Sequence, residues 1–213
     1  MLRTPPLRGP AAPTFHTDAR SERLFHEHRK LSNDAQTYAY AHPRLAVLGE
    51  DPVVDHLIAS HGFGWHDLVA LRLYADGRTI TAICVPTRLW RDPDAKSRLL
   101  ELKSEARLER TACVLVPQRW LRASIRGSVA RTIARSRGVQ YARAQADAVL
   151  AHLTESRIST IAESAACVRD HHDPMSIVLS LASQGFIELD RSAPLRAETL
   201  VSVARSMARR TRR

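Results

Sequence analysis

The chain has 213 residues, 44% of them hydrophobic, and its 32 Lys and Arg residues against 22 Asp and Glu residues give a formal net charge of +10. This length suits one large domain or two small ones, and no apolar run approaches the ~20 residues of a membrane-spanning helix, so we expect no membrane partner. The three cysteines, Cys84, Cys113 and Cys167, form no CxxC pair, which argues against a zinc ribbon and a disulfide framework. The N-terminal segment lacks the apolar core of a secretory signal, and we expect a cytoplasmic protein.

Most of the positive charge is arginine, whose guanidinium group binds phosphates in bidentate geometry. A net charge of this size favours a polyanionic partner, and DNA is the partner that we expect. A generally arginine-rich composition is the alternative explanation of the charge.

Residues 1–20 are rich in proline and offer little to bury, so we expect a disordered basic arm. Residues 21–140 are predicted to form a nuclease-like α/β domain with a helical extension at its N-terminus. The first core helix of this domain has Asp51 as a plausible N-cap and Pro52 as its first residue, and it stops at Gly62.

A β-hairpin follows this helix. The runs DLVALRLY and TITAICVPT flank the letters ADGR, and an Asp-Gly pair between two such runs is a strong hairpin signal. The second run is apolar on both faces, which predicts a central buried strand. A helix over DPDAKSRLLELKSEARLER, a strand over TACVLVP and a helix over RWLRASIRGSVARTIARSRG complete the domain. We therefore expect a small mixed sheet flanked by helices, an α/β (α+β) fold.

Residues 141–204 have the pattern of a winged helix-turn-helix domain. Three short helices are predicted, of which the second opens with a capping box of Thr160 and Glu163 and the third has Asp173 as its N-cap. A strand over FIELD follows, and then another strand or helix. Residues 205–213 are predicted to be a flexible basic tail.

The string PD…ELK, which ends in Glu101, Leu102 and Lys103, spells the motif of metal-dependent nucleases. That motif needs a strand, on which residues two apart share a face. On a helix, two residues differ by about 200°, and the surrounding leucines and Glu, Lys and Arg residues predict a helix. We therefore expect Glu101 and Lys103 on a solvated helix face, pointing apart.

The element order, with a winged helix after it, resembles that of the TnsA-type transposon endonucleases, which join a restriction-endonuclease-like core to such a domain. The resemblance covers about Leu45 to Val203 and implies a magnesium-dependent DNA endonuclease. It implies an acid on the first helix, for which Glu50 or Asp55 would serve, and an Asp on a central strand, for which Asp76 of the hairpin turn is the nearest candidate. The strand TAICVPTRLW stands in place of the catalytic strand and has no Lys, so the resemblance implies a relative that lacks the catalytic motif.

No other metal or cofactor site is indicated. His56, His61 and His66 are five residues apart, and a helix would turn the first two to different sides. A zinc site needs three or four convergent ligands.

Nucleic-acid binding is indicated by a long stretch, from Arg110 to Ala146, that contains no acidic residue. Such a field attracts phosphates and makes binding depend strongly on salt. The arginines that we expect to contact phosphates are Arg119, Arg122, Arg126, Arg131, Arg135, Arg137, Arg143 and, in the tail, Arg209 and Arg210.

The third helix of the predicted winged helix has no Lys or Arg. Ser176 and Ser180 could touch bases or phosphates, whereas Met175 and Leu179, if exposed, would form a protein-docking surface. The neighbouring candidates for phosphate contact are Arg169, His171, His172 and Arg191.

These observations favour a non-catalytic DNA-binding protein that acts as a transcription regulator or a recombination accessory factor. One alternative is a metal-dependent endonuclease that uses Glu50, Asp55 and Asp76 with magnesium. The other is a protein-interaction adaptor of a mobile element, in which the charge only aids solubility. A homodimer is compatible with each of these functions.

Overall fold

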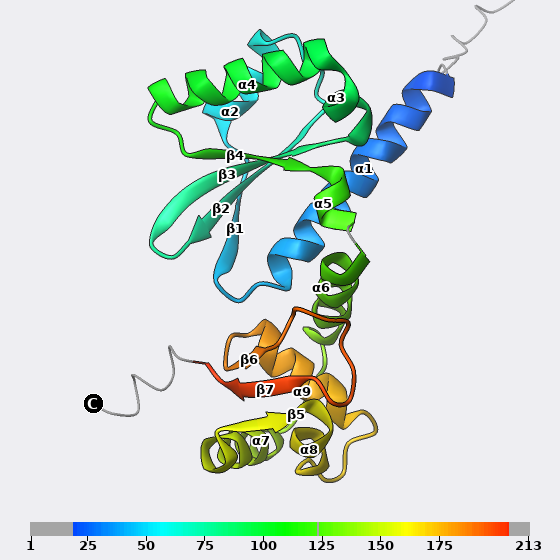
Figure 1. The fold of residues 1–213 in the computed structure, drawn as a ribbon, viewed down its shortest axis with the longest axis vertical. Helices are drawn as coiled ribbons and strands as arrows, with labels where there is room; N and C mark the ends of the chain where they lie inside the picture. Colours follow the sequence, from blue (N-terminus) through cyan, green and yellow to red (C-terminus); the bar gives the residue numbers. More distant parts are fainter. Residues whose placement is uncertain (1–18, 123, 205–213) are drawn as a thin grey trace, which may run out of the picture.

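The computed structural model of the protein describes residues 19–122 and 124–204 (Figure 1). The side chains that it leaves out within these ranges are those of Arg20, Ser124 and Arg126. Most of the predicted N-terminal arm, and the tail with Arg209 and Arg210, lie outside the described residues. The described part contains a four-stranded and a three-stranded sheet with helices around them, which confirms the mixed α/β class. None of its helices is long and apolar enough to cross a membrane.

The four-stranded sheet has the order β1-β2-β3-β4. The first three strands are antiparallel neighbours and β4 runs parallel to β3. Asp76 and Gly77 both have positive φ, of 45° and 84°, at the predicted hairpin turn, as a tight β-hairpin requires. The strands are β1 (Leu45–Gly49), β2 (Val69–Ala75), β3 (Arg78–Val85) and β4 (Cys113–Pro117).

Strand β3 is buried on both faces, as its sequence predicts, because helices cover both sides of the sheet. Side chains alternate along a strand, so Ile83 and Val85 pack with α2 and α4, whereas Cys84 packs with α1 and α5. The helices of this half are α1 (Ala19–Tyr40), α2 (Pro52–Ser60), α3 (Thr87–Arg91), α4 (Pro93–Leu108) and α5 (Gln118–Arg122).

The C-terminal half follows the order helix, strand, helix, helix, strand, strand after α6, and its sheet has the order β5-β7-β6. This order is compatible with a winged helix-turn-helix. The predicted capping box is confirmed: Glu163 N–H donates to Thr160 Oγ1 at 3.1 Å, and Thr160 N–H donates to Glu163 Oε2 at 2.9 Å. The elements are α6 (Ser124–Ser136), α7 (Arg143–Ser156), β5 (Ile158–Thr160), α8 (Ile161–Ala166), α9 (Pro174–Ser183), β6 (Ile187–Leu189) and β7 (Leu200–Val203).

Helix α6 belongs to the core of the C-terminal half. Its side chains Val129, Ala130 and Ile133 are buried among residues of α7, α8 and α9, and Figure 1 shows α6 between the two sheets. Packing therefore divides the chain between α5 and α6, ahead of the boundary at residue 140 that the sequence suggests. The C-terminal end of α1 also reaches this core, because Ala41 is buried in it.

Helix α9 is covered on almost every side, which corrects two expectations about its surface. Leu179 is only 7% exposed and Ser180 is 0% exposed, because α6, α7, α8 and β6 pack around this helix. Met175, at the start of the helix, is exposed as expected. The exposed part of α9 is thus confined to its first turn and to Gln184 at its end.

Candidate nucleic-acid interface

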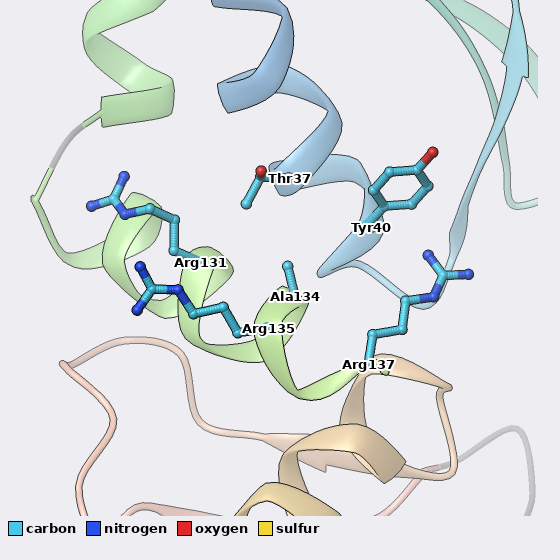
Figure 2. A pocket seen from close by; sticks show the side chains of 6 residues that line it. All are labelled: Thr37, Tyr40, Arg131, Ala134, Arg135 and Arg137. Atoms are coloured by element: carbon cyan, nitrogen blue, oxygen red, sulfur yellow. The ribbon is translucent and has the colours of Figure 1, made fainter. Parts of the chain in front are cut away.

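The two sides of α6 differ in chemistry. Val129 and Ile133 face the C-terminal core, whereas Arg131 and Arg135, four residues apart and therefore on one side of the helix, are exposed. Figure 2 shows these two side chains extending next to each other from α6. The apolar pattern of the helix thus determines where its arginines point.

A groove of about 690 Å³ lies between the end of α1 and the end of α6. Arg137, just beyond α6, lies beside Tyr40 of α1 in Figure 2, and its guanidinium carbon is 4.9 Å from the centroid of the tyrosine ring. The ring orients this guanidinium group through a cation–π contact. The groove is lined by Thr37, Tyr40, Arg131, Ala134, Arg135 and Arg137.

None of the three groove arginines has a carboxylate partner, unlike Arg44, Arg88, Arg122 and Arg143. Arg131, Arg135 and Arg137 make no ion pair with any residue that the structure describes, and no acid lines the groove. Unpaired guanidinium groups keep their full charge for an anion, and a second anion gains less from a guanidinium that is already paired. The groove therefore gathers three unpaired guanidinium groups that can bind phosphate.

Two of the arginines expected to contact phosphate are paired within the protein. Arg122 Nε donates to Asp34 Oδ2 at 2.7 Å, and Arg143 Nε lies 3.7 Å from Asp147 Oδ2 in an exposed pair one helical turn apart. Arg119 is exposed and lies outside the groove, while the side chain of Arg126 is not described. The arginines of the acid-free stretch thus differ in whether a carboxylate of the protein already pairs with them.

The remaining candidates of the C-terminal half do not line the groove either. Arg169 and His172 are exposed, and the rings of His171 and His172 stack with centroids 4.5 Å apart. Ser176 Oγ donates to the carboxylate of Asp173 at the start of α9. These groups lie on the segment that joins α8 to α9 and on the first turn of α9.

Ser180 is the one candidate that its position rules out as a contact. It is fully buried and its Oγ accepts a hydrogen bond from Gln184 Nε2 at 3.1 Å, so its hydroxyl serves the interior of the protein. Arg191 is partly buried in a hollow between the two halves and is taken up below.

The three acids proposed for a nuclease site do not converge. Glu50 and Asp55 line one hollow of about 600 Å³, and burial, followed by the charges of Glu50 and Asp51, raises the pKa of Asp55. Asp76 lies near the first residue of β1, because its neighbour Ala75 pairs with Leu45. Glu50 follows the last residue of β1, at the opposite end of the strand. Four residues of strand place these ends roughly 13 Å apart. The set of Glu50, Asp55 and Asp76 is therefore corrected: one ion cannot be shared by all three.

The PD…ELK string lies on α4, as predicted. Leu102 is completely buried, whereas Glu101 and Lys103 on either side of it are exposed. The two polar side chains thus form part of a solvated helix face.

Two other acids do converge, and sequence analysis missed them. Arg88 Nε donates to Glu27 Oε2 at 3.1 Å, and its Nη2 donates to Asp67 Oδ1 at 2.7 Å. Burial by itself would raise the pKa of Asp67, but the hydrogen bonds from Arg88 and from the Gly64 N–H outweigh it and lower that pKa. No sequence signal joins these residues, because α1, the residues before β2 and the start of α3 meet only in the fold.

Within the described residues, no group of three or more His, Cys, Asp and Glu side chains is placed to hold a metal ion. On strand β3, burial raises the pKa of the Cys84 thiol to about 12, so this side chain behaves as a small apolar residue.

Comparison with known protein families, with curated proteins and with solved structures gives no match to this chain. The function is therefore argued from the chemistry of the site.

Proposed function

We propose that this protein is a non-catalytic DNA-binding protein that holds the sugar-phosphate backbone in the groove between α1 and α6. The observation that supports this most directly is the set of three exposed arginines, Arg131, Arg135 and Arg137, around one groove without a carboxylate. Neutralising phosphates with such groups releases counterions from the nucleic acid, which favours binding whatever the base sequence.

The burial of α9 supports contact with the backbone over base reading. In a winged helix, the helix at this position would enter the major groove, but here its side is packed against α6. We therefore expect weak sequence preference, as in an accessory factor of recombination or a regulator that obtains its specificity from a partner. Arg137 and Tyr40 offer in addition a flat surface on which an unpaired base could stack.

The ion pairs that Glu27 and Asp67 make with Arg88 favour a DNA-binding function over an endonuclease function. These two carboxylates flank Arg88, whose guanidinium group pairs with both of them. A divalent cation would have to displace a hydrogen-bonded arginine before it could use them.

The test is binding of a fluorescently labelled DNA duplex at about 150 mM salt, the range in which backbone contacts still contribute. The variant Arg131→Gln, Arg135→Gln, Arg137→Gln should bind much more weakly than the wild type. The matched control removes three exposed charges from α3 and α4, with Arg91→Gln, Lys103→Gln and Arg107→Gln, and should bind like the wild type apart from the common loss of net charge.

Three results would count against the proposal. Equal weakening by both triple variants would show that only the overall charge matters. Undetectable binding by the wild type would favour the protein-interaction adaptor. Cleavage of supercoiled plasmid with magnesium, lost on Asp67→Asn but not with the groove variant, would favour the endonuclease.

A further inference from the structure

A second arginine site lies where the two halves of the protein meet. The β6–β7 loop, residues 190–199, turns back toward α6 and the end of α1 (Figure 1). Arg191 and Ser192 of this loop line a cavity of about 350 Å³ together with Tyr38, His42 and apolar side chains of α1 and α6. Arg191 is thus partly buried and lines the cavity between the two halves.

Arg191 is partly buried, yet no hydrogen bond or ion pair joins its side chain to any residue in the described part of the chain. The cavity lining contains no acid. Arg44, which lines a neighbouring cavity together with Arg191, already has a partner, because its Nη2 lies 3.5 Å from Glu188 Oε1. A guanidinium group cannot lose its proton in a protein, so its partial burial without a carboxylate partner disfavours this position for Arg191.

The pKa of Arg191 reflects this unfavourable environment. Burial lowers the pKa of Arg191, and Tyr38, which acts in the opposite direction, does not offset it, so the surroundings disfavour the charged form of Arg191. An anion in the cavity would remove this penalty and would give the guanidinium group the acceptors that it lacks.

The donors around the cavity indicate which anion fits. Arg191 presents a planar fork suited to two oxygens of one phosphate. Ser192 adds a hydroxyl, and His42 adds a ring nitrogen that becomes a second donor when the ring is protonated. A wider cavity of about 480 Å³ shares His42 and Arg191 and is also lined by Arg44 and Glu188, which pair with each other, so the group that carries the phosphate has room to extend into it.

We propose that this junction cavity binds a phosphate group, with Arg191 as its main donor and His42 and Ser192 as additional donors. The bound phosphate would hold the β6–β7 loop on α1 and so fix the C-terminal half against the N-terminal half. The site shares no lining residue with the α1–α6 groove and does not depend on the function proposed for that groove.

Binding should be tighter in mild acid. His42 faces Arg191 of the loop, Arg44 before β1 and Asp76 of the hairpin turn, and its ring lies 5.8 Å from that of Tyr38. Burial, and after it the charges of Arg191 and Arg44, lower the pKa of His42, while Asp76 acts in the opposite direction. A bound phosphate reverses the balance and favours protonated His42, so the contribution of His42 to the affinity should increase as the pH falls through the range in which its ring takes up a proton.

The experiment measures inorganic phosphate binding to the full chain by calorimetry, and the melting temperature in phosphate against chloride at equal ionic strength. Arg191→Gln removes the main donor, and Arg191→Lys keeps the charge but loses the fork. Arg196→Gln is the matched control, because Arg196 is an exposed arginine of the same loop outside the cavity. We expect Arg191→Gln to bind phosphate roughly tenfold more weakly or worse, Arg191→Lys to be intermediate, and Arg196→Gln to match the wild type.

The source of the phosphate is distinguished by three ligands: inorganic phosphate, a DNA duplex with a 5′-terminal phosphate, and the same duplex without it. Preference for the terminally phosphorylated duplex, lost in Arg191→Gln, would assign the site to a DNA end. Response to inorganic phosphate alone would assign it to a small phosphate ligand.

The proposal is overturned if Arg191→Gln and wild type bind phosphate equally, or if neither responds to it. That failure leaves the DNA proposal intact, because the groove variant of Arg131, Arg135 and Arg137 tests a different surface. Conversely, a groove variant that loses DNA but keeps the phosphate response supports both proposals as separate sites.

Discussion

Replacing Arg131, Arg135 and Arg137 together by glutamine should lower both the affinity for duplex DNA and the dependence of that affinity on salt. Glutamine keeps much of the length and polarity of each side chain and removes its charge. The substituted side chains project from α6 and the residue beyond it, away from the core formed by Val129 and Ile133. The fold should therefore remain intact.

The size of the effect follows from the number of unpaired guanidinium groups in the groove. Each phosphate that an arginine neutralises contributes about −0.9 to the slope of log K against log salt, so three lost contacts should flatten the slope by about 2.7. The same relation, taken from 1 M to about 0.15 M salt, gives a loss of about fivefold per arginine and on the order of 100-fold for all three. Arg122 should count for less, because Asp34 already holds it.

The assay is a titration of labelled duplex, followed by fluorescence anisotropy, at several salt concentrations for the wild type, the groove variant and the control variant of Arg91, Lys103 and Arg107. The control has the same net charge as the groove variant. Its slope should remain that of the wild type, because α3 and α4 lie away from the groove. If both variants flatten the slope equally, or if neither does, the assignment of phosphate contacts to the groove is wrong.

Three further predictions concern stability. Thr81→Val removes the hydroxyl that donates to Asp51 at 2.5 Å in a buried position, and leaving that carboxylate unpaired should reduce the free energy of unfolding by roughly 1–3 kcal/mol. Thr160→Ala removes the oxygen that caps α8 and should reduce it by roughly 0.5–2 kcal/mol. Both are measured by urea denaturation. His42 has a lower pKa in the folded chain than in the unfolded chain, so the unfolded chain binds the additional proton. The free energy of unfolding should therefore rise with pH up to about 6.5 and then level off, with a smaller rise in His42→Asn.

Each of these has its own control. Thr79→Val changes an exposed threonine of the same strand and should be nearly neutral; a loss equal to that of Thr81→Val would show that the buried hydrogen bond is not the cause. Ser156→Ala, at the end of α7, tests whether any hydroxyl deletion costs as much as the loss of the Thr160 cap. An identical pH profile for wild type and His42→Asn would show that His42 is not the group that titrates.

The local signals of the sequence were sufficient for the hairpin and most helices. The Asp-Gly pair at Asp76, the capping box at Thr160 and the Asp173 cap with Pro174 all depend on interactions within a few residues, and each lies where predicted. Strands β1 and β5 were missed, because each owes its conformation to a partner strand distant in the chain.

The sequence by itself determined the positive charge, the acid-free stretch that contains α6 and the helix on which Glu101 and Lys103 diverge, since each of these follows from composition or helical periodicity. Only the tertiary structure decided which arginines are free. Asp34 neutralises Arg122 from 88 residues away and Glu27 reaches Arg88 across 61 residues, and a sequence pattern of short period has no means of recording such distant pairs. The same long-range packing buries α9 and Ser180, turns Arg191 inward, and leaves the groove arginines as the unpaired positive charge that lines one groove.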